Sequence, residues 1–118
     1  MTTGTKYNGW TNYETWCVNL WIGNEEPSYL HWREVATEIW DARDEHPDYW
    51  TESEYARFTL ADALQEWAEE SAPDLGASMW TDLLTAALSE VRWSEIANSM
   101  LAETDGYEAP TADYTAQP

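Results

Sequence analysis

The segment WTNYETWCVNLWIGN, residues 10–24, contains the start, the end and the apolar surface of one helix. Thr11 and Glu14 have the spacing of a capping box, in which the Thr side chain caps the first turn and the Glu side chain bonds back to it. Gly23 and Asn24 tolerate the left-handed backbone that often ends a helix. Apolar residues lie on nearly every side: Trp16, Cys17, Val18, Leu20, Trp21 and Ile22. Since a helix that is apolar all round is normally buried, we expect it at the centre of the core.

Four later segments have the three- and four-residue periodicity of amphipathic helices, and no segment alternates as a strand. They cover about residues 26–45, 52–71, 78–91 and 94–102. Thr51 and Glu54 form a second capping-box pattern before the second of them. The predicted inward faces are, in order, Trp32, Val35, Ala36, Ile39 and Trp40; Leu60, Ala61, Leu64, Trp67 and Ala68; Trp80, Leu83, Leu84, Ala87, Leu88 and Val91; Ile96, Ala97, Met100 and Leu101. The sequence therefore predicts an all-α fold, a compact bundle of four to five helices.

The two ends of the chain lack this periodicity. Residues 1–9 are small and polar, and residues 103–118 combine Thr, Ala, Asp, Gly and two Pro around Tyr107 and Tyr114. Such composition is typical of segments without a packed core. We expect a flexible N-terminus over 1–9, a helical domain over 10–102 and a disordered acidic C-terminal tail over 103–118.

The charge is the most unusual bulk property. Twenty-three Asp and Glu residues face one Lys and four Arg, which gives a formal net charge of −18, while nine Trp and seven Tyr supply apolar bulk for a core. Net charge is informative about partners and solubility rather than about fold. The single Cys17 permits no intrachain disulfide and fits a reducing compartment. No stretch resembles a signal peptide or a membrane span, so the predicted location is the cytoplasm of a host cell.

The acids are not scattered along the predicted helices. At 100° per residue they gather opposite the apolar faces of two helices, without interleaved Lys or Arg. The first stripe consists of Glu34, Glu38, Asp41 and Glu45, and the second of Asp62, Glu66, Glu69 and Glu70, with Glu52 on the same side. Like charges three and four residues apart destabilise a helix, so a surface shaped for stability alone would have used Lys.

Two stripes on neighbouring helices, with loop acids such as Asp48 and Asp74, would present a DNA-like field to a basic groove. We therefore expect a DNA mimic that inhibits a DNA-binding protein, with the two stripes imitating phosphates. Two other interpretations stay open. The stripes are ordinary solvated faces, which is the commoner case for acidic helices, or the acidity is adaptation to a salty solvent. Salt adaptation predicts acids on every face and unfolding in dilute buffer.

Other sites are disfavoured. His31, His46 and Cys17 have no zinc-ligand spacing, and no nucleophile motif or phosphate loop is present, so neither a metal, a cofactor nor enzymatic activity is predicted. Five cations cannot hold a nucleic-acid backbone against twenty-three acids, and direct nucleic-acid binding or attachment to an anionic membrane is not expected. Arg43 and Arg57 lie near inward faces, where an ion pair at the core edge, such as one with Glu14, is the expected role.

Trp50 is the aromatic residue that the sequence places in a loop, beside Tyr49 and before the third helix. An exposed Trp often anchors a partner. The more ordinary role is to staple the start of the helix that follows.

Two motifs suggest a family. The segments YNGWTNYETWCVNLWIGN, residues 7–24, and VRWSEIANSML, residues 91–101, resemble small phage- and plasmid-borne proteins that share a W-T-N-x-E-T-W start and a V-x-W-x-E-I-A end. The resemblance implies a mobile-element setting and supplies no catalytic or binding residues. In composition the chain is also similar to anti-restriction and anti-CRISPR DNA mimics.

The predicted function is inhibition of a host defence protein, a restriction or CRISPR effector, by occupation of its basic nucleic-acid site. The alternative is a helical protein–protein adaptor, whose acidity reflects salt adaptation or solubility. An adaptor would bind through the Trp and Leu surfaces of its last helices, with Trp93 and Leu101 as the sensitive positions. The sequence identifies neither the target, the stoichiometry, the oligomeric state nor the host.

Overall fold

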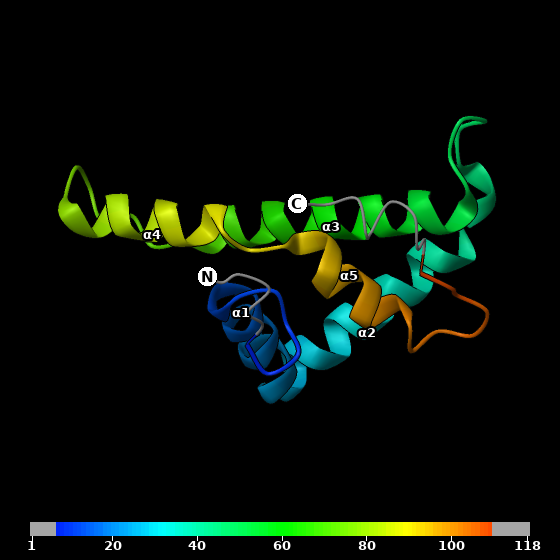
Figure 1. Ribbon diagram of the computed structural model, residues 1–118, viewed down its shortest axis with the longest axis horizontal. Coiled ribbons are helices and arrows are strands. Elements are labelled where there is room, and N and C mark those ends of the chain that lie inside the picture. The colour runs from blue at the N-terminus through cyan, green and yellow to red at the C-terminus, as the bar shows by residue number, and fades with distance from the viewer. Residues whose placement is uncertain (1–6, 110–118) are drawn as a thin grey trace.

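The computed structural model describes residues 7–109 and shows an all-α protein (Figure 1). Within that range the only β-type pairing is an isolated bridge between Tyr7 and Trp10. The helices are α1 (Tyr13–Asn24), α2 (Glu26–Asp41), the short 3₁₀ helix η1 (Arg43–Glu45), α3 (Glu52–Ser71), α4 (Met79–Ser89) and α5 (Trp93–Leu101). The predicted fold class is confirmed.

The core lies where α2, α3 and α5 meet. α5 packs against both α3 and α2, and Figure 1 shows it between them, with α3 along one edge of the view. Leu60 and Leu64 of α3 are fully buried with Ile96 and Leu101 of α5. α2 adds three buried residues, Trp32, Ala36 and Trp40. These are members of the predicted inward faces, so the periodicity identified this core correctly.

The position of α1 differs from the prediction. Only Thr15 and Ile22 of this helix are buried, and Trp21 is 64% exposed, so α1 lies at the edge of the molecule rather than at its centre. Its cap also differs: Asn12, not Thr11, accepts a hydrogen bond from the Thr15 N–H at 2.9 Å. An all-round apolar sequence does not show which side finds a partner, and here α2 and α5 cover one side only.

The two sequence motifs meet at the starts of α1 and α5. The backbone N–H of Thr11 donates to both carboxylate oxygens of Glu95 at 3.2 Å, and the N–H of Arg92 donates to the Thr15 hydroxyl at 2.9 Å. The Asn12 amide donates to the carbonyl of Glu90 at 2.8 Å. In an ordinary capping box the third residue of a helix bonds back to its own N-cap. Here Thr15 and Glu95, each the third residue of its helix, satisfy the N–H groups that precede the other helix.

The helix expected over residues 26–45 is shorter than predicted. α2 ends at Asp41, and the chain continues into η1, so Glu45 does not lie on the same helix as Glu34. The helix over residues 52–71 has the predicted bounds, and both hydrogen bonds of its capping box form between Thr51 and Glu54.

α4 does not pack as predicted. Trp80 and Leu83, which the periodicity placed inward, are 61% and 54% exposed, and α4 has no buried residue. It packs closely against none of the other helices in the described part of the chain. Its sequence is apolar on several sides, and only the tertiary structure shows that the side with Trp80 and Leu83 is left exposed by the rest of residues 7–109.

The folded domain extends beyond the predicted boundary at residue 102. Tyr107 is 8% exposed, its ring packs edge-on against Trp40, and its hydroxyl donates to Asn98. The Trp40 indole N–H also donates to the carbonyl of Asp105 at 2.8 Å. At the other end, the ring of Tyr7, predicted as part of a flexible terminus, packs near Trp16. Residues 1–6 and 110–118 of the predicted terminal segments lie outside the described residues.

We predict that Thr15→Val destabilises the protein by about 1–3 kcal/mol, because the Arg92 N–H loses its acceptor in a part-buried site while side-chain volume is kept. The measurement is the free energy of unfolding in urea. Thr37→Val is the matched control, since Thr37 is exposed and bonds only within its own helix, to the carbonyl of Arg33. Equal effects of the two substitutions would contradict the structural role of the junction.

Burial raises the pKa of Tyr107 to about 12, although nearby Arg57 acts in the opposite direction. The pKa of an unfolded Tyr is about 10, so the folded state holds this proton more tightly and stability falls as pH rises from about 10 to 12. We predict that Tyr107→Phe flattens this fall in urea denaturation at several pH values. Tyr49→Phe, at a 79% exposed ring, should leave the pH dependence unchanged.

Candidate partner-binding site

The acidic stripe of α3 lies on one uninterrupted helix. Asp62, Glu66, Glu69 and Glu70 are all exposed, on the side opposite the buried Leu64. Positions 62–70 span about 12 Å at 1.5 Å per residue, so these four carboxylates recur on average about every 4 Å along the axis. One strand of duplex DNA carries a charge about every 3.4 Å. The stripe therefore has roughly the linear charge density of a single row of phosphates.

The stripe of α2 is shorter than predicted. Glu34, Glu38 and Asp41 are exposed on α2. Glu45 is exposed too, but it lies on η1, after the helical register has changed at Ala42. Three carboxylates, rather than four, thus share the face that the sequence predicted.

The structure does not bring the two stripes onto one surface. Each lies opposite the buried face of its own helix, and the buried faces of α2 and α3 meet in one core with α5. Two outward faces of helices around a shared core point in different directions. The combined field predicted from neighbouring helices therefore separates into two acidic surfaces, and α3 carries the denser one.

The carboxylates of these stripes have no cationic partner among the described residues. Within residues 7–109 none of the eight forms a salt bridge with Lys or Arg. Arg43 pairs with Glu52 at 3.5 Å, rather than with Glu14, and its guanidinium lies 4.4 Å from the centre of the Trp40 ring. Glu69 accepts a hydrogen bond from the Gln65 amide at 3.2 Å, which keeps its charge. The negative field of both stripes is therefore left unneutralised in this part of the chain.

Trp50 contacts the start of α3. Its ring is half-buried and lies 4.9 Å from the Phe58 ring and 6.3 Å from the Tyr55 ring, centre to centre. This arrangement is that of a staple, in which a residue before the N-cap packs against the first turns. Tyr49 is the more exposed of the two loop aromatics. Anchoring of a partner by Trp50 stays a prediction.

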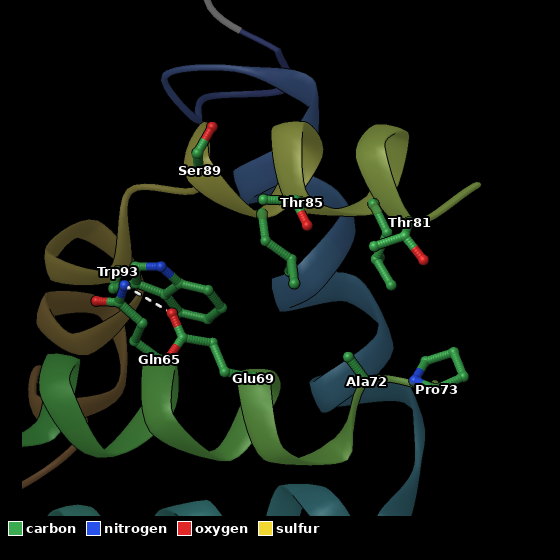
Figure 2. A pocket seen from close by; sticks show the side chains of 10 residues that line it. Gln65, Glu69, Ala72, Pro73, Thr81, Thr85, Ser89 and Trp93 are labelled. Atoms are coloured by element: carbon green, nitrogen blue, oxygen red, sulfur yellow. Dashed lines mark hydrogen bonds between the residues drawn. The ribbon is translucent and has the colours of Figure 1, made fainter. Parts of the chain in front are cut away.

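Sequence reasoning missed a groove between α3 and α4 (Figure 2). It has a volume of about 460 Å³ and is open to solvent. Its lining consists of Gln65, Glu69, Ala72, Pro73, Thr81, Leu84, Thr85, Leu88, Ser89 and Trp93. The periodicity of α4 indicated that Leu84 and Leu88 share a face, but it predicted that this face would be filled by packing.

Neither a metal centre nor a membrane-spanning segment is found in the described residues. Over 7–109 no three His, Cys, Asp or Glu side chains are placed to hold one metal ion. No helix in that range combines the length and the apolar character that a bilayer requires.

Residues 3–107 match a family of unknown function, DUF7249. The chain belongs to this family. The match includes both motifs, the two stripes and the groove, so all the features described above lie within the DUF7249 region. No curated protein and no solved structure matches the chain.

We predict that neutralising the α3 stripe of this DUF7249 chain stabilises it. Glu66→Gln together with Glu70→Gln removes a like-charge pair four residues apart, which is worth a few tenths of a kcal/mol. The gain in the free energy of unfolding, measured in urea, should shrink in high salt because salt already screens the repulsion. Glu52→Gln, which removes the partner of Arg43, is the contrasting variant and should give no gain.

Proposed function

We propose that this protein is a DNA mimic, which binds the basic nucleic-acid site of a host protein and blocks DNA binding. The observation that carries the proposal is the α3 stripe, where Asp62, Glu66, Glu69 and Glu70 are exposed on one helix without a salt bridge inside residues 7–109. Repulsion between these carboxylates lowers the stability of the free protein. The same charges become favourable when a partner places cations beside them.

The spacing of the carboxylates supports mimicry over a general acidic surface. The α3 stripe matches the charge spacing of one DNA strand, as estimated above. The α2 stripe consists of Glu34, Glu38 and Asp41. It would extend the negative field to another face of the molecule, instead of forming a second row beside the α3 stripe. Binding would be fast at low ionic strength and weakened by salt, as for other electrostatically steered complexes.

The proposed target is a restriction or CRISPR effector of the host, and the proposed role is that of a mobile-element inhibitor without enzymatic activity. The support is the resemblance of the two sequence motifs to phage- and plasmid-borne proteins, and the similarity in composition to known DNA mimics. Such a role places the protein in the host cytoplasm.

The test compares two variants with the same change in charge. One replaces the α3 acids with amides (Asp62→Asn with Glu66, Glu69 and Glu70→Gln), and the other replaces the α2 set (Asp41→Asn with Glu34, Glu38 and Glu45→Gln). A partner captured from host cells is purified, and inhibition of its binding to a labelled duplex is measured at low and physiological ionic strength. We expect the α3 variant to inhibit at least about tenfold less, with a weaker salt dependence.

The α2 variant is the comparison, because it removes the same charge from the sparser acidic surface of α2 and η1, where the proposal expects a smaller effect. A general effect of net charge would weaken both variants equally and would contradict a defined phosphate-like surface. Unchanged inhibition and unchanged salt dependence in the α3 variant would contradict the proposal altogether. Unfolding of the wild-type chain in dilute buffer, monitored by circular dichroism, would favour salt adaptation instead.

A helical adaptor is the second candidate, and one observation favours it. Met79, Trp80 and Leu83 form an exposed apolar face on α4. The residues that the sequence assigned to this role are unsuitable, because Trp93 and Leu101 are buried in the core. An adaptor would lose its partner on Trp80→Ala and keep it in the amide variants, which separates it from a mimic.

A further inference from the structure

The groove between α3 and α4 is an unusual feature for two helices joined by a short loop. Neighbouring antiparallel helices normally pack 8–10 Å apart and fill the space between them. α4 does not pack closely on α3, and about 460 Å³ is left open between them. In Figure 2, Trp93 lies at one end of the groove and Ala72 and Pro73 at the other.

The lining combines apolar side chains with uncharged polar ones and a single carboxylate, that of Glu69. Leu84 and Leu88 supply large, half-buried apolar side chains, the mostly buried ring of Trp93 closes one end, and Glu69 points into the groove from α3 (Figure 2). None of the lining residues is basic. On the surrounding surface, Asp62 and Glu66 continue the α3 stripe along the same helix.

We propose that this groove receives an amphipathic helix of a partner protein, with apolar residues on one face and Lys or Arg along its flanks. Two flanking helices with an apolar floor are the surroundings of helix-in-groove recognition. The acids at the edge select cationic flanks by charge complementarity. A second copy of this chain would bring another net charge of −18 to the same place and is disfavoured by repulsion.

The inference rests on the proposed function in one respect, since it assumes that the partner is basic. It adds what the acidic stripe alone does not provide, a site for apolar side chains beside the charges. Buried apolar anchors carry most of the affinity at interfaces, whereas exposed charges mainly set rate and specificity. The acidic stripe of α3 would then direct the partner to this surface, and apolar contacts in the groove would supply most of the affinity.

The test uses the full chain and a synthetic probe. The probe is a fluorescein-labelled helix of about 18 residues with Leu on one face and Lys on its flanks, and the second probe has Gln in place of Lys. Fluorescence anisotropy gives the Kd. We expect the Lys probe to bind at least about tenfold more tightly than the Gln probe, because only the first has cations for Glu69 and its neighbours.

Adjacent positions on α4 supply matched variants. Leu84 lines the groove, whereas Leu83 is exposed and outside it. Leu84→Asp should weaken the Lys probe at least about tenfold, and Leu83→Asp less than about twofold, although both add the same negative charge. Thr85→Arg and Ala86→Arg form a second pair: only Thr85 lines the groove, and a cation there should repel the Lys flanks. Both positions are exposed, so these two variants keep the test valid if Leu84→Asp does not fold.

Equal loss in the members of each pair, or equal binding of both probes, would overturn the inference. Sedimentation velocity gives a further overturning result, a dimer that dissociates on Leu84→Asp, which would assign the groove to a second copy. The two proposals also fail separately. If probe binding depends on Leu84 but the α3 amide variant still inhibits the host protein, the DNA-mimic proposal is contradicted. The proposal for the groove is then still supported.

Discussion

The reciprocal capping of α1 and α5 determines how the chain closes on itself. Both helices begin with N–H groups that have no partner within their own helix, and burial makes such groups costly unless another residue accepts. Glu95 accepts from Thr11, and Thr15 accepts from Arg92, so each helix start is completed by the other. Residues 84 and 77 positions apart are thereby held together, and α1 is attached to α5.

This attachment explains why α1 is stable at the edge of the molecule. Its contribution to the core is small, since Trp21 is exposed and Ile22 is its buried apolar residue. Polar contacts at its start, rather than burial along its length, fix its position. The two motifs that suggested a family therefore have a structural role: they form the junction, which leaves the functional surface to other elements.

The surface proposed to bind a partner consists of parts that the core does not need. α3 buries Leu60 and Leu64 against α5 and leaves its acids outside, while α4 has no buried residue and, within residues 7–109, packs loosely, with Leu88 alone of its side chains against the core. A helix that is apolar on several sides and unpacked has a free-energy gain available on binding. Placed beside an acidic row, it favours a partner that is both basic and amphipathic.

The sequence determined the local structure, the core of α2, α3 and α5, and the exposure of all eight acids, because these follow from helical periodicity and capping. It did not determine where α1 and α4 lie, since Trp21 and Trp80 have the spacing of core residues but are left exposed by the described part of the chain. It also missed Tyr107, an isolated aromatic outside any helical pattern that packs on Trp40. The separation of the two stripes and the groove beside α3 depend on how the helices pack in three dimensions. Contacts between distant residues decide that packing, and the periodicity of a single segment holds no information about them.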